Sequence, residues 1–558
     1  MADRLIYLPL GGAGEIGMNA YVYGYGPAGR ERLILVDLGV TFGDMDSSPG
    51  IDLIMPDLRW LEKNRDRLEA IFITHGHEDH VGALGLLWDR LKVPVYCRKF
   101  TGALARMKLE ENGQPIDALR IVEARPEAVE AGPFKLQFVP VSHSIPESAA
   151  LIIDSPAGRI VHSGDFKLDG TPVVGETFDP VLWREIANEG DGVKVLTCDS
   201  TNVFVTHPGR SEAALAEPLN DFVKAQKQMV VATTFASNLA RLKSLAEAGI
   251  ASGRKVCLLG RAMRRMVAAA VETGVLTGFP GTIPPEEVAN LPRDQVMLIV
   301  TGSQGERRAA SAQLARGRYL GLELTEGDSF LFSSRTIPGN ERAVLRIMNG
   351  LSAKGVNVFD AEDGMLHVSG HANRPDLEAV HDLLRPAVVI PMHGEHMHLR
   401  AHRDLALGKG SASVVAVNGD MLDLAGDAPK LVDQVDTGRL YLDGTVLIGA
   451  MDGVVRDRIR MALNGHAMVS IIIDEDGHPL PDAWVECNGL PVQGRSHSPL
   501  AERIEDELAK FLERADKRTV ADDGKLDDAM RRITRQVTME EIGKKPEITV
   551  IISRLALD

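Results

Sequence analysis

The chain of 558 residues contains only four cysteines, few aromatic side chains and no long apolar segment. The cysteines form no C-x-x-C pair, which argues against a disulfide framework or a thiolate zinc site and predicts buried thiols in a reducing compartment. No run of 18 or more apolar residues occurs, and no apolar segment follows a basic N-terminus. We therefore expect a cytoplasmic protein with no membrane span.

Aromatic residues make up only 5% of the chain, so the core must consist mostly of Leu, Val, Ile and Ala. Hydrophobic and charged fractions of 44% and 25% are ordinary for a globular protein. The net charge of −16 argues against broad, nonspecific binding to nucleic acid, although it does not exclude a locally basic channel.

The most informative segment is His75-Gly-His77-Glu-Asp79-His80, directly after an apolar strand predicted at 70–74. Imidazole and carboxylate ligands without thiolate favour Zn²⁺, and less commonly Mn²⁺ or Fe²⁺. We predict that the loop presents these ligands to two adjacent metal ions, because the four side chains cannot all reach one ion. Two-metal sites are suited to hydrolysis of phosphate or acyl bonds. The alternative interpretation is a polar, His-rich surface loop.

Three further candidate ligands each follow a predicted buried strand, where a rigid scaffold can orient them. His143 follows the strand predicted at 135–139, and His393 follows the apolar run 387–390. Asp165 follows a third strand, and its two carboxylate oxygens could bridge two cations.

The segment Gly12-Ala-Gly14-Glu-Ile-Gly17 matches the G-x-G-x-x-G pattern of dinucleotide-binding proteins, and Asp37 lies 20 residues further on. In such proteins the turn opens a helix. Residues 18–24 alternate and end in glycine, which predicts a strand instead. A tight turn near the metal site is therefore the favoured interpretation.

The pattern along the chain predicts an α/β fold in several domains. Residues 212–360 contain longer βα units, which predict a parallel-sheet domain inserted into the first one, because ligand-type residues return after it. We expect the following parts: a first domain at 1–211 and 361–435, the insertion at 212–360, a linker at 436–450, and a small α/β C-terminal domain at 451–558. The last part has more acidic than basic residues, which favours packing or oligomerisation over RNA binding.

These motifs resemble those of the metallo-β-lactamase superfamily and, within it, the β-CASP nucleases. The superfamily resemblance rests on H-x-H-x-D-H, His143 and Asp165, and the β-CASP resemblance on 199–202 (DSTN), 367–371 (HVSGH) and 391–395 (PMHGE). Segments 11–19, 301–306 and 337–341 resemble the bacterial ribonuclease J family over essentially the whole chain. The resemblance implies an αββα metallo-β-lactamase sandwich with an inserted β-CASP domain.

The resemblance also implies two Zn²⁺ ions per subunit, with Mn²⁺ or Mg²⁺ as alternatives. The implied ligands are His75, His77 and His143 for one ion, Asp79, His80 and His393 for the other, and Asp165 as the bridge. Water activated by the ions would attack the phosphodiester.

Three catalytic assignments follow from the same resemblance. His371 would stabilise charge at the scissile phosphate or protonate the leaving oxygen. Asp199 would orient a histidine, and Asp79 counts as catalytic as well as metal-binding. A satisfied buried polar group remains the alternative for His371 and Asp199, and for His367 a structural role is equally open.

Members of the family remove nucleotides from a 5′ end and also cut internally, in rRNA processing and mRNA decay. The expected substrate is single-stranded RNA with a 5′-monophosphate, held in a pocket that excludes a triphosphate. The residues implied for this pocket are Ser237, Asn238, Ser369, Gly370, His371 and Ala372. A homodimer or homotetramer, and membership of an RNA-degradation complex, are also expected.

The chain departs from the family pattern at Leu239-Ala240, where relatives carry an apolar residue and His, and at Arg307-Arg308, where a Pro is common. These departures concern RNA contact and leave the metal chemistry unaffected. A basic channel could be supplied by Arg261, Arg264, Arg265, Arg307, Arg308 and Arg335, although each could equally be a surface arginine.

Three other functions compete with an RNA nuclease. A thioesterase or similar hydrolase on this scaffold would lack the 212–360 insertion. A noncatalytic RNA-processing scaffold would lack metal ligands, and all seven are present here. A DNA-repair β-CASP nuclease is the third alternative, and activity on RNA distinguishes it.

Overall fold

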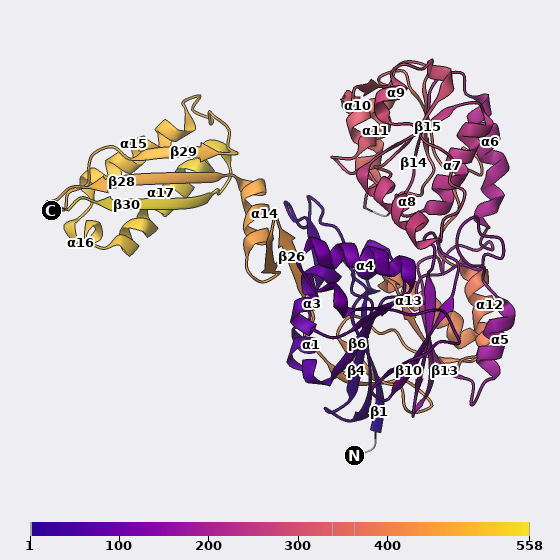
Figure 1. Cartoon of the computed structure of the whole chain (residues 1–558). Helices are drawn as coiled ribbons and strands as arrows, with labels where there is room; N and C mark the ends of the chain where they lie inside the picture. The colour runs from indigo at the N-terminus through magenta and orange to yellow at the C-terminus, as the bar shows by residue number, and fades with distance from the viewer. Residues whose placement is uncertain (1–2, 338, 362, 557–558) are drawn as a thin grey trace. The chain divides into compact units, whose positions relative to one another are not determined.

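The computed structural model describes residues 3–337, 339–361 and 363–556 (Figure 1). Contacts within the chain define two compact units. The first comprises residues up to Thr41 together with Met55–Arg439, and the second comprises Phe42–Ile54 together with residues from Leu440 onward. Position 338, within the 337–341 motif, lies outside the described residues. In the described part, no helix is both long and apolar enough to cross a membrane.

Two sheets form the framework of the first unit, with strand orders β25-β24-β1-β3-β4-β6-β7-β8 and β23-β21-β13-β12-β11-β10-β9. The first contains β1 (Asp3–Gly11), β3 (Ala20–Pro27), β4 (Arg32–Val36), β6 (Leu68–Phe72), β7 (Val95–Cys97), β8 (Leu119–Ile121), β24 (Asp420–Asp423) and β25 (Lys430–Gln434). The second contains β9 (Val129–Ala131), β10 (Phe134–Pro140), β11 (Ala149–Ser155), β12 (Gly158–His162), β13 (Val193–Asp199), β21 (Val388–Met392) and β23 (Ala412–Ser413). The strand predicted after the G-x-G-x-x-G segment is confirmed as β3, so no helix begins there.

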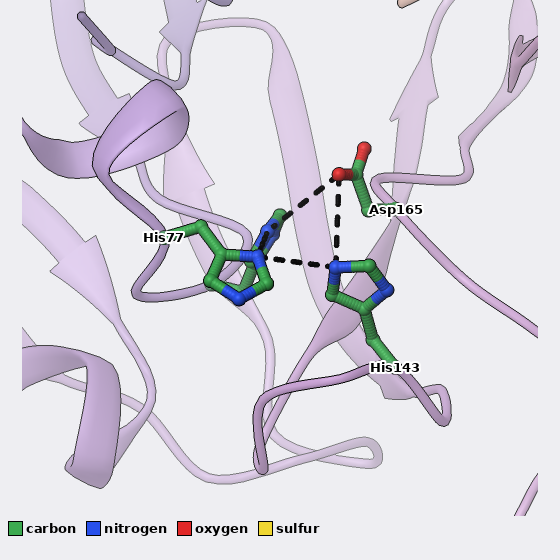
Figure 2. A group of neighbouring side chains, drawn as sticks. His77, His143 and Asp165 are labelled. Atoms are coloured by element: carbon green, nitrogen blue, oxygen red, sulfur yellow. Dashed lines mark hydrogen bonds and ion pairs between the residues drawn. The ribbon is translucent and has the colours of Figure 1, made fainter. Parts of the chain in front are cut away.

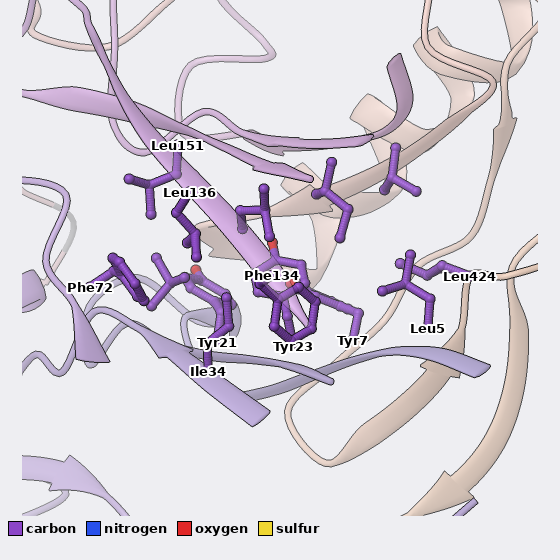
Figure 3. Packing of buried hydrophobic residues seen from close by; sticks show 14 of the residues in the cluster. Leu5, Tyr7, Tyr21, Tyr23, Ile34, Phe72, Phe134, Leu136, Leu151 and Leu424 are labelled. Atoms are coloured by element: carbon purple, nitrogen blue, oxygen red, sulfur yellow. The ribbon is translucent and has the colours of Figure 1, made fainter. Parts of the chain in front are cut away.

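Buried side chains from both sheets fill the space between them (Figure 3). Tyr7 and Tyr23 come from the first sheet, and Leu136 and Leu151 come from the second. The Tyr7 and Tyr23 ring centroids lie 5.5 Å apart. Aromatic side chains from both sheets therefore contribute to this core, although aliphatic side chains form most of it.

Helices cover the outer faces of the two sheets. Along the first sheet lie α1 (Arg59–Lys63), α3 (Leu84–Leu91) and α4 (Lys99–Glu111) (Figure 1). The second sheet is covered by α5 (Pro180–Asn188), α12 (Arg374–Leu384) and α13 (His396–Gly408). Their side chains Trp183, Leu377 and Ala406 pack in one cluster with Ile152 and Leu196 of the sheet. This arrangement confirms the αββα sandwich.

The inserted segment forms a separate parallel sheet of order β15-β16-β14-β19-β20. Its strands are β14 (Val230–Thr233), β15 (Lys255–Leu259), β16 (Val296–Val300), β19 (Ser329–Phe332) and β20 (Asn357–Phe359). Side chains of α6 (Ala216–Ala225), α7 (Leu239–Ala251) and α8 (Arg261–Thr273) pack in one cluster on this sheet, and those of α10 (Ala310–Arg316) and α11 (Glu341–Ser352) pack in another. The predicted inserted parallel-sheet domain is thereby confirmed as a fold, while its boundaries stay a prediction.

The second unit contains a three-stranded sheet of order β29-β28-β30 with two long helices against it. Its elements are β28 (His466–Ile473), β29 (Trp484–Asn488), β30 (Glu547–Arg554), α15 (Leu500–Arg514) and α17 (Asp523–Ile542). Helix α15 buries Leu500, Ile504, Leu508 and Leu512, a four-residue spacing that places them on one face. The segment 436–450, expected as a linker, carries the hairpin of β26 (Arg439–Asp443) and β27 (Val446–Gly449).

Candidate metal centre

The six-residue histidine motif begins where β6 ends and is only partly a loop. His75 and His77 lie in the extended connection, whereas Asp79 and His80 lie on the one-turn helix α2 (Glu78–Val81). The prediction of a loop throughout is therefore wrong for its second half. The helical turn directs Asp79 and His80 to a different point from His75 and His77, which separates the ligands into two groups.

The first group contains His75, His77, His143 and Asp165, whose ligand atoms all lie within 4.8 Å of one another. Figure 2 shows His77, His143 and Asp165 directed toward one point. His77 Nδ1 lies 3.1 Å from both His75 Nε2 and His143 Nε2. The other nitrogen of His143, Nδ1, lies 2.7 Å from the carbonyl oxygen of Gly370. A carbonyl only accepts, so this Nδ1 carries the proton and Nε2 presents a lone pair to the group.

The second group contains Asp79, His80, Asp165 and His393, again with ligand atoms within 4.8 Å of one another. His80 Nε2 lies 3.2 Å from Asp165 Oδ2, and His393 Nε2 lies 3.2 Å from Asp79 Oδ2. Asp165 belongs to both groups, as the sequence predicted for a bridging carboxylate. The structure thus brings all seven predicted ligands together.

A carboxylate that the sequence analysis had not assigned to the site orients His80. Asp37 Oδ2 lies 2.7 Å from His80 Nδ1, and Asp37 also accepts hydrogen bonds from the amide and hydroxyl of Thr74. Asp37 is fully buried and has a positive φ of 62°. In the sequence, Asp37 stands out only as a ribose-binding acid of the rejected dinucleotide interpretation. Its position directly after the buried strand β4, like those of the other site residues, was the signal that could have identified it.

The glycine-rich turn supports the centre from another side. Gly12 has a φ of +83°, and a Cβ there would lie 2.2 Å from Asn19 Oδ1. Asn19 in turn donates to the backbone carbonyl of Asp79 from its backbone and side-chain nitrogens, at 2.9 and 3.0 Å. Ala13 pairs with Gly394, directly after His393. Glycine is therefore needed for close packing beside the candidate ligands.

Burial and charge act in opposite directions on the histidines. Burial lowers the pKa of His77 to about 4 and lowers the pKa of His75 and His143 well below the usual value. Burial also opposes the charge on His393, but Asp165, Asp199 and Asp79 outweigh it and raise the pKa of His393 to about 10. The imidazoles of the first group are therefore neutral and can act as ligands.

The donor set fits divalent metal ions. Every ligand atom is an imidazole nitrogen or a carboxylate oxygen, which suits Zn²⁺ or Mn²⁺. In the described part of the chain, Asp165 Oδ1 is buried and has no hydrogen-bond partner. A buried carboxylate oxygen without a donor is costly unless a cation neutralises it. The residues present therefore fit the divalent metal ions that the fold implies.

His371 lies beside both groups and contacts a second carboxylate. His371 Nδ1 is 2.7 Å from Asp199 Oδ2 and 3.9 Å from Asp165 Oδ2. Burial lowers the pKa of His371, but Asp199 and Asp165 outweigh it, so the pKa is raised overall. Its side chain keeps 22% exposure and can reach a substrate from the solvent side.

The loop after β13 fixes several of these groups together. Thr201 Oγ1 lies 2.7 Å from Asp199 Oδ1 and 2.9 Å from His393 Nδ1. Asn202 Nδ2 donates to Ser369 Oγ at 2.8 Å and to the His371 carbonyl at 3.3 Å. The segment 199–202 therefore positions both His371 and His393.

Three buried side chains, Cys198, His381 and His402, pack against the loop that follows β13. The ligand atoms of Cys198, His381 and His402 lie within 4.8 Å of one another. His381 Nε2 is 3.1 Å from His402 Nε2, and His402 Nδ1 is 3.0 Å from Ser200 Oγ. These contacts connect α12 and α13 to the residue that follows Asp199.

The residues expected to hold a 5′ phosphate lie in two segments joined by the buried Arg241. Arg241 Nη1 lies 3.1 Å from His367 Nδ1 and donates to the Ser333 carbonyl at 2.7 Å, and its guanidinium pairs with Glu212. Its charge is therefore neutralised within the fold. His367 has a structural partner in this network.

Several of the expected phosphate-binding atoms already have partners. Asn238 accepts from the Arg241 amide at 2.9 Å as the cap of α7, and the Ala372 amide donates to Phe166 at 2.6 Å. Ser237 is partly exposed, so its side chain is accessible to a phosphate. Leu239 and Ala240 are buried in α7, whereas the arginines proposed for a basic channel are all exposed.

Comparisons with known proteins match each part of the chain to a family. Residues 14–205 match the metallo-beta-lactamase superfamily, and 227–351 match the ribonuclease J beta-CASP domain. Residues 364–416 match the RNA specificity domain of Zn-dependent metallo-hydrolases, and 453–555 match the ribonuclease J C-terminal domain. The superfamily match implies bound metal ions, consistent with the two ligand groups.

Full-length relatives agree with these matches. Ribonuclease J of Sinorhizobium meliloti is 39% identical over 554 residues, covering 99% of this chain and 98% of the relative. Ribonuclease J of Mycolicibacterium smegmatis is 34% identical, covering 97% and 95%. A crystal structure of a protein of unknown function from Enterococcus faecalis shares the fold, with a TM-score of 0.50 and 18% identity over 75% of this chain and 100% of that one. The chain therefore belongs to the ribonuclease J family, within the metallo-β-lactamase superfamily.

Proposed function

We propose that this protein is a metal-dependent ribonuclease that degrades RNA from the 5′ end, prefers a 5′-monophosphate and also cuts internally. The observation that carries the proposal is the convergence of five histidines and two aspartates on two groups that share Asp165. The relatives named ribonuclease J support RNA as the substrate. We assign the site two Zn²⁺ ions, with Mn²⁺ or Mg²⁺ as alternatives.

In this proposal His75, His77 and His143 would hold one ion and Asp79, His80 and His393 the other, while Asp165, which belongs to both groups, would serve both. When bound, two such ions lower the pKa of a water molecule and stabilise the extra negative charge on the attacked phosphate.

The protein's own side chains orient the ligands and handle a proton. Asp37 accepts the Nδ1 proton of His80, and the Gly370 carbonyl accepts that of His143, so each imidazole keeps its other nitrogen free for coordination. Asp199 accepts the Nδ1 proton of His371, which leaves Nε2 to hold the proton that the leaving 3′-oxygen requires.

The 5′-monophosphate preference is supported by the position of the serines. Ser369 lies two residues before His371 and is fixed by Asn202, while Ser237 precedes the cap of α7. Arg241 of α7 donates to the Val368 carbonyl and contacts His367 Nδ1. These contacts hold the segment that contains Ser237 next to the segment that contains Ser369. Hydroxyl and amide groups at the start of a helix favour a bound phosphate.

The test compares decay of two RNAs that differ only at the 5′ end. We expect rapid release of mononucleotides from 5′-monophosphorylated RNA and much slower release from the 5′-triphosphorylated form. Equal exonucleolytic rates would show that no pocket selects the monophosphate. Internal cutting of a circular RNA, which has no end, measures the endonuclease activity separately.

A further inference from the structure

Phe204 is an exposed aromatic residue close to the candidate metal centre. Its side chain is 51% exposed, and among the described residues only Phe42 and Trp484 are Phe or Trp side chains with comparable exposure. The other aromatic rings of this chain are buried or partly buried, apart from these two. An aromatic ring exposed to this extent is accessible to a ligand.

The backbone around Phe204 is fixed on both sides. The Val203 amide donates to the Ser200 carbonyl at 3.2 Å, and the Val205 amide donates to the Asn202 carbonyl at 2.9 Å. The Val205 carbonyl accepts from the Arg374 amide at 3.0 Å, and Val203 is fully buried. The exposed ring therefore stands on an ordered loop, so a ligand can bind it with little loss of conformational entropy.

A second ring supports Phe204. Its centroid lies 5.3 Å from that of His398, with 53° between the planes. His398 lies on α13, five residues after His393, and Phe204 lies three residues after Thr201. The segments of these two rings are joined at the metal centre, where Thr201 Oγ1 is 2.9 Å from His393 Nδ1. Three residues span at most about 11 Å, so the Phe204 backbone lies within that distance of Thr201.

We propose that Phe204, supported by His398, is a stacking platform for a nucleobase next to the phosphodiester that is cleaved. The inference rests on the proposed ribonuclease function and adds a binding site for the base. A ring face binds any base, so it suits an enzyme that must pass along an RNA of mixed sequence. The net charge of −16 weakens attraction to the phosphate backbone, which increases the value of an uncharged contact.

The experiment measures KM for a short 5′-monophosphorylated RNA, and the bound metal content, for wild type, Phe204→Leu and Phe204→Tyr. Leucine retains apolar volume and removes the ring, whereas tyrosine retains the ring. We expect Phe204→Leu to raise KM for the RNA by roughly 5- to 150-fold and Phe204→Tyr to stay within about twofold of wild type. The bound metal content should equal that of wild type in both variants.

A series of RNAs with one abasic nucleotide tests the contact directly. Wild type should lose affinity when one particular base near the cleaved bond is absent, and Phe204→Leu should be insensitive at that same position. Equal sensitivity of the two proteins at every position would overturn the platform. A loss of bound metal in Phe204→Leu would also overturn it, because the residue would then support the metal centre. Failure of the wild type to cleave any RNA would instead refute the proposed ribonuclease function.

Discussion

His371 Nδ1 lies 2.7 Å from Oδ2 of Asp199, which is almost completely buried at the end of β13. This contact fixes the tautomer and the orientation of the ring, because a carboxylate accepts the Nδ1 proton. Asp199 is fixed in turn by Thr201, which also contacts His393. The candidate proton donor and one candidate metal ligand are thus positioned by the same short loop.

Replacing Asp199 with asparagine tests this positioning role. We expect Asp199→Asn to lower kcat on RNA about 10- to 100-fold with little change in KM, since the amide cannot hold the imidazolium. The bound metal content should remain at the wild-type value. The role would be refuted if kcat were unaffected, or if the metal were lost together with activity.

The Asp37 carboxylate provides a separate test of the metal centre. We expect Asp37→Asn to weaken metal binding about 10- to 100-fold, because His80 loses the partner that orients it. Metal content is measured after dialysis against increasing concentrations of chelator. Asp57→Asn is the matched control, since Asp57 is also a buried aspartate but does not contact the ligand groups. Identical chelator sensitivity of Asp37→Asn and wild type would exclude the role.

The Arg241–Glu212 pair predicts a large effect on stability. Both side chains are almost fully buried, and Arg241 also contacts Ser333 and His367. We expect Arg241→Met to destabilise the inserted domain by about 3–5 kcal/mol, because it leaves the buried Glu212 carboxylate unpaired. The double variant with Glu212→Leu should recover much of this loss. Denaturant unfolding measures both, and equal stability of the single variant and wild type would contradict the prediction.

The C-terminal sheet predicts where copies of the chain associate. The buried side chains of this sheet pack against α15 and α17 on one face, and Trp484 and Ile551 flank Ser470 on the other face. Trp484 is 53% exposed and Ile551 is 42% exposed. We expect the double variant Trp484→Glu, Ile551→Glu to shift the protein toward monomers in sedimentation experiments while retaining activity on bis(p-nitrophenyl) phosphate. An unchanged oligomeric distribution would place the interface elsewhere.

The sequence predicted the parts of the fold in which local pattern and burial agree. Strand β28 alternates buried and more exposed side chains, and helix α15 repeats apolar residues every four positions. Both periods are visible in the sequence and predict the type of each element. Polar residues at both ends of helix α17 obscure its apolar period. The segment Phe42–Ile54 packs with the second unit, and no local signal in the sequence indicates this long-range contact.

The seven ligand-type side chains were predictable because each is of a residue type that can bind metals and each lies shortly after a buried strand. The role of Asp37 was missed because its partner, His80, lies 43 residues away, and only the folded chain brings them together. The His381–His402 pair behind Ser200 was missed for the same reason. Residues that orient ligands across sheets depend on tertiary structure, which a local motif does not reveal.

The most direct measurement is digestion of 5′-labelled, 5′-monophosphorylated RNA by wild type and by His77→Ala, each with its metal content determined. We expect labelled mononucleotide from the wild type, none detectable from His77→Ala, and two divalent ions per chain in the wild type. A wild type that holds both ions and cleaves no RNA, or a His77→Ala variant as active as wild type, would contradict a two-metal ribonuclease.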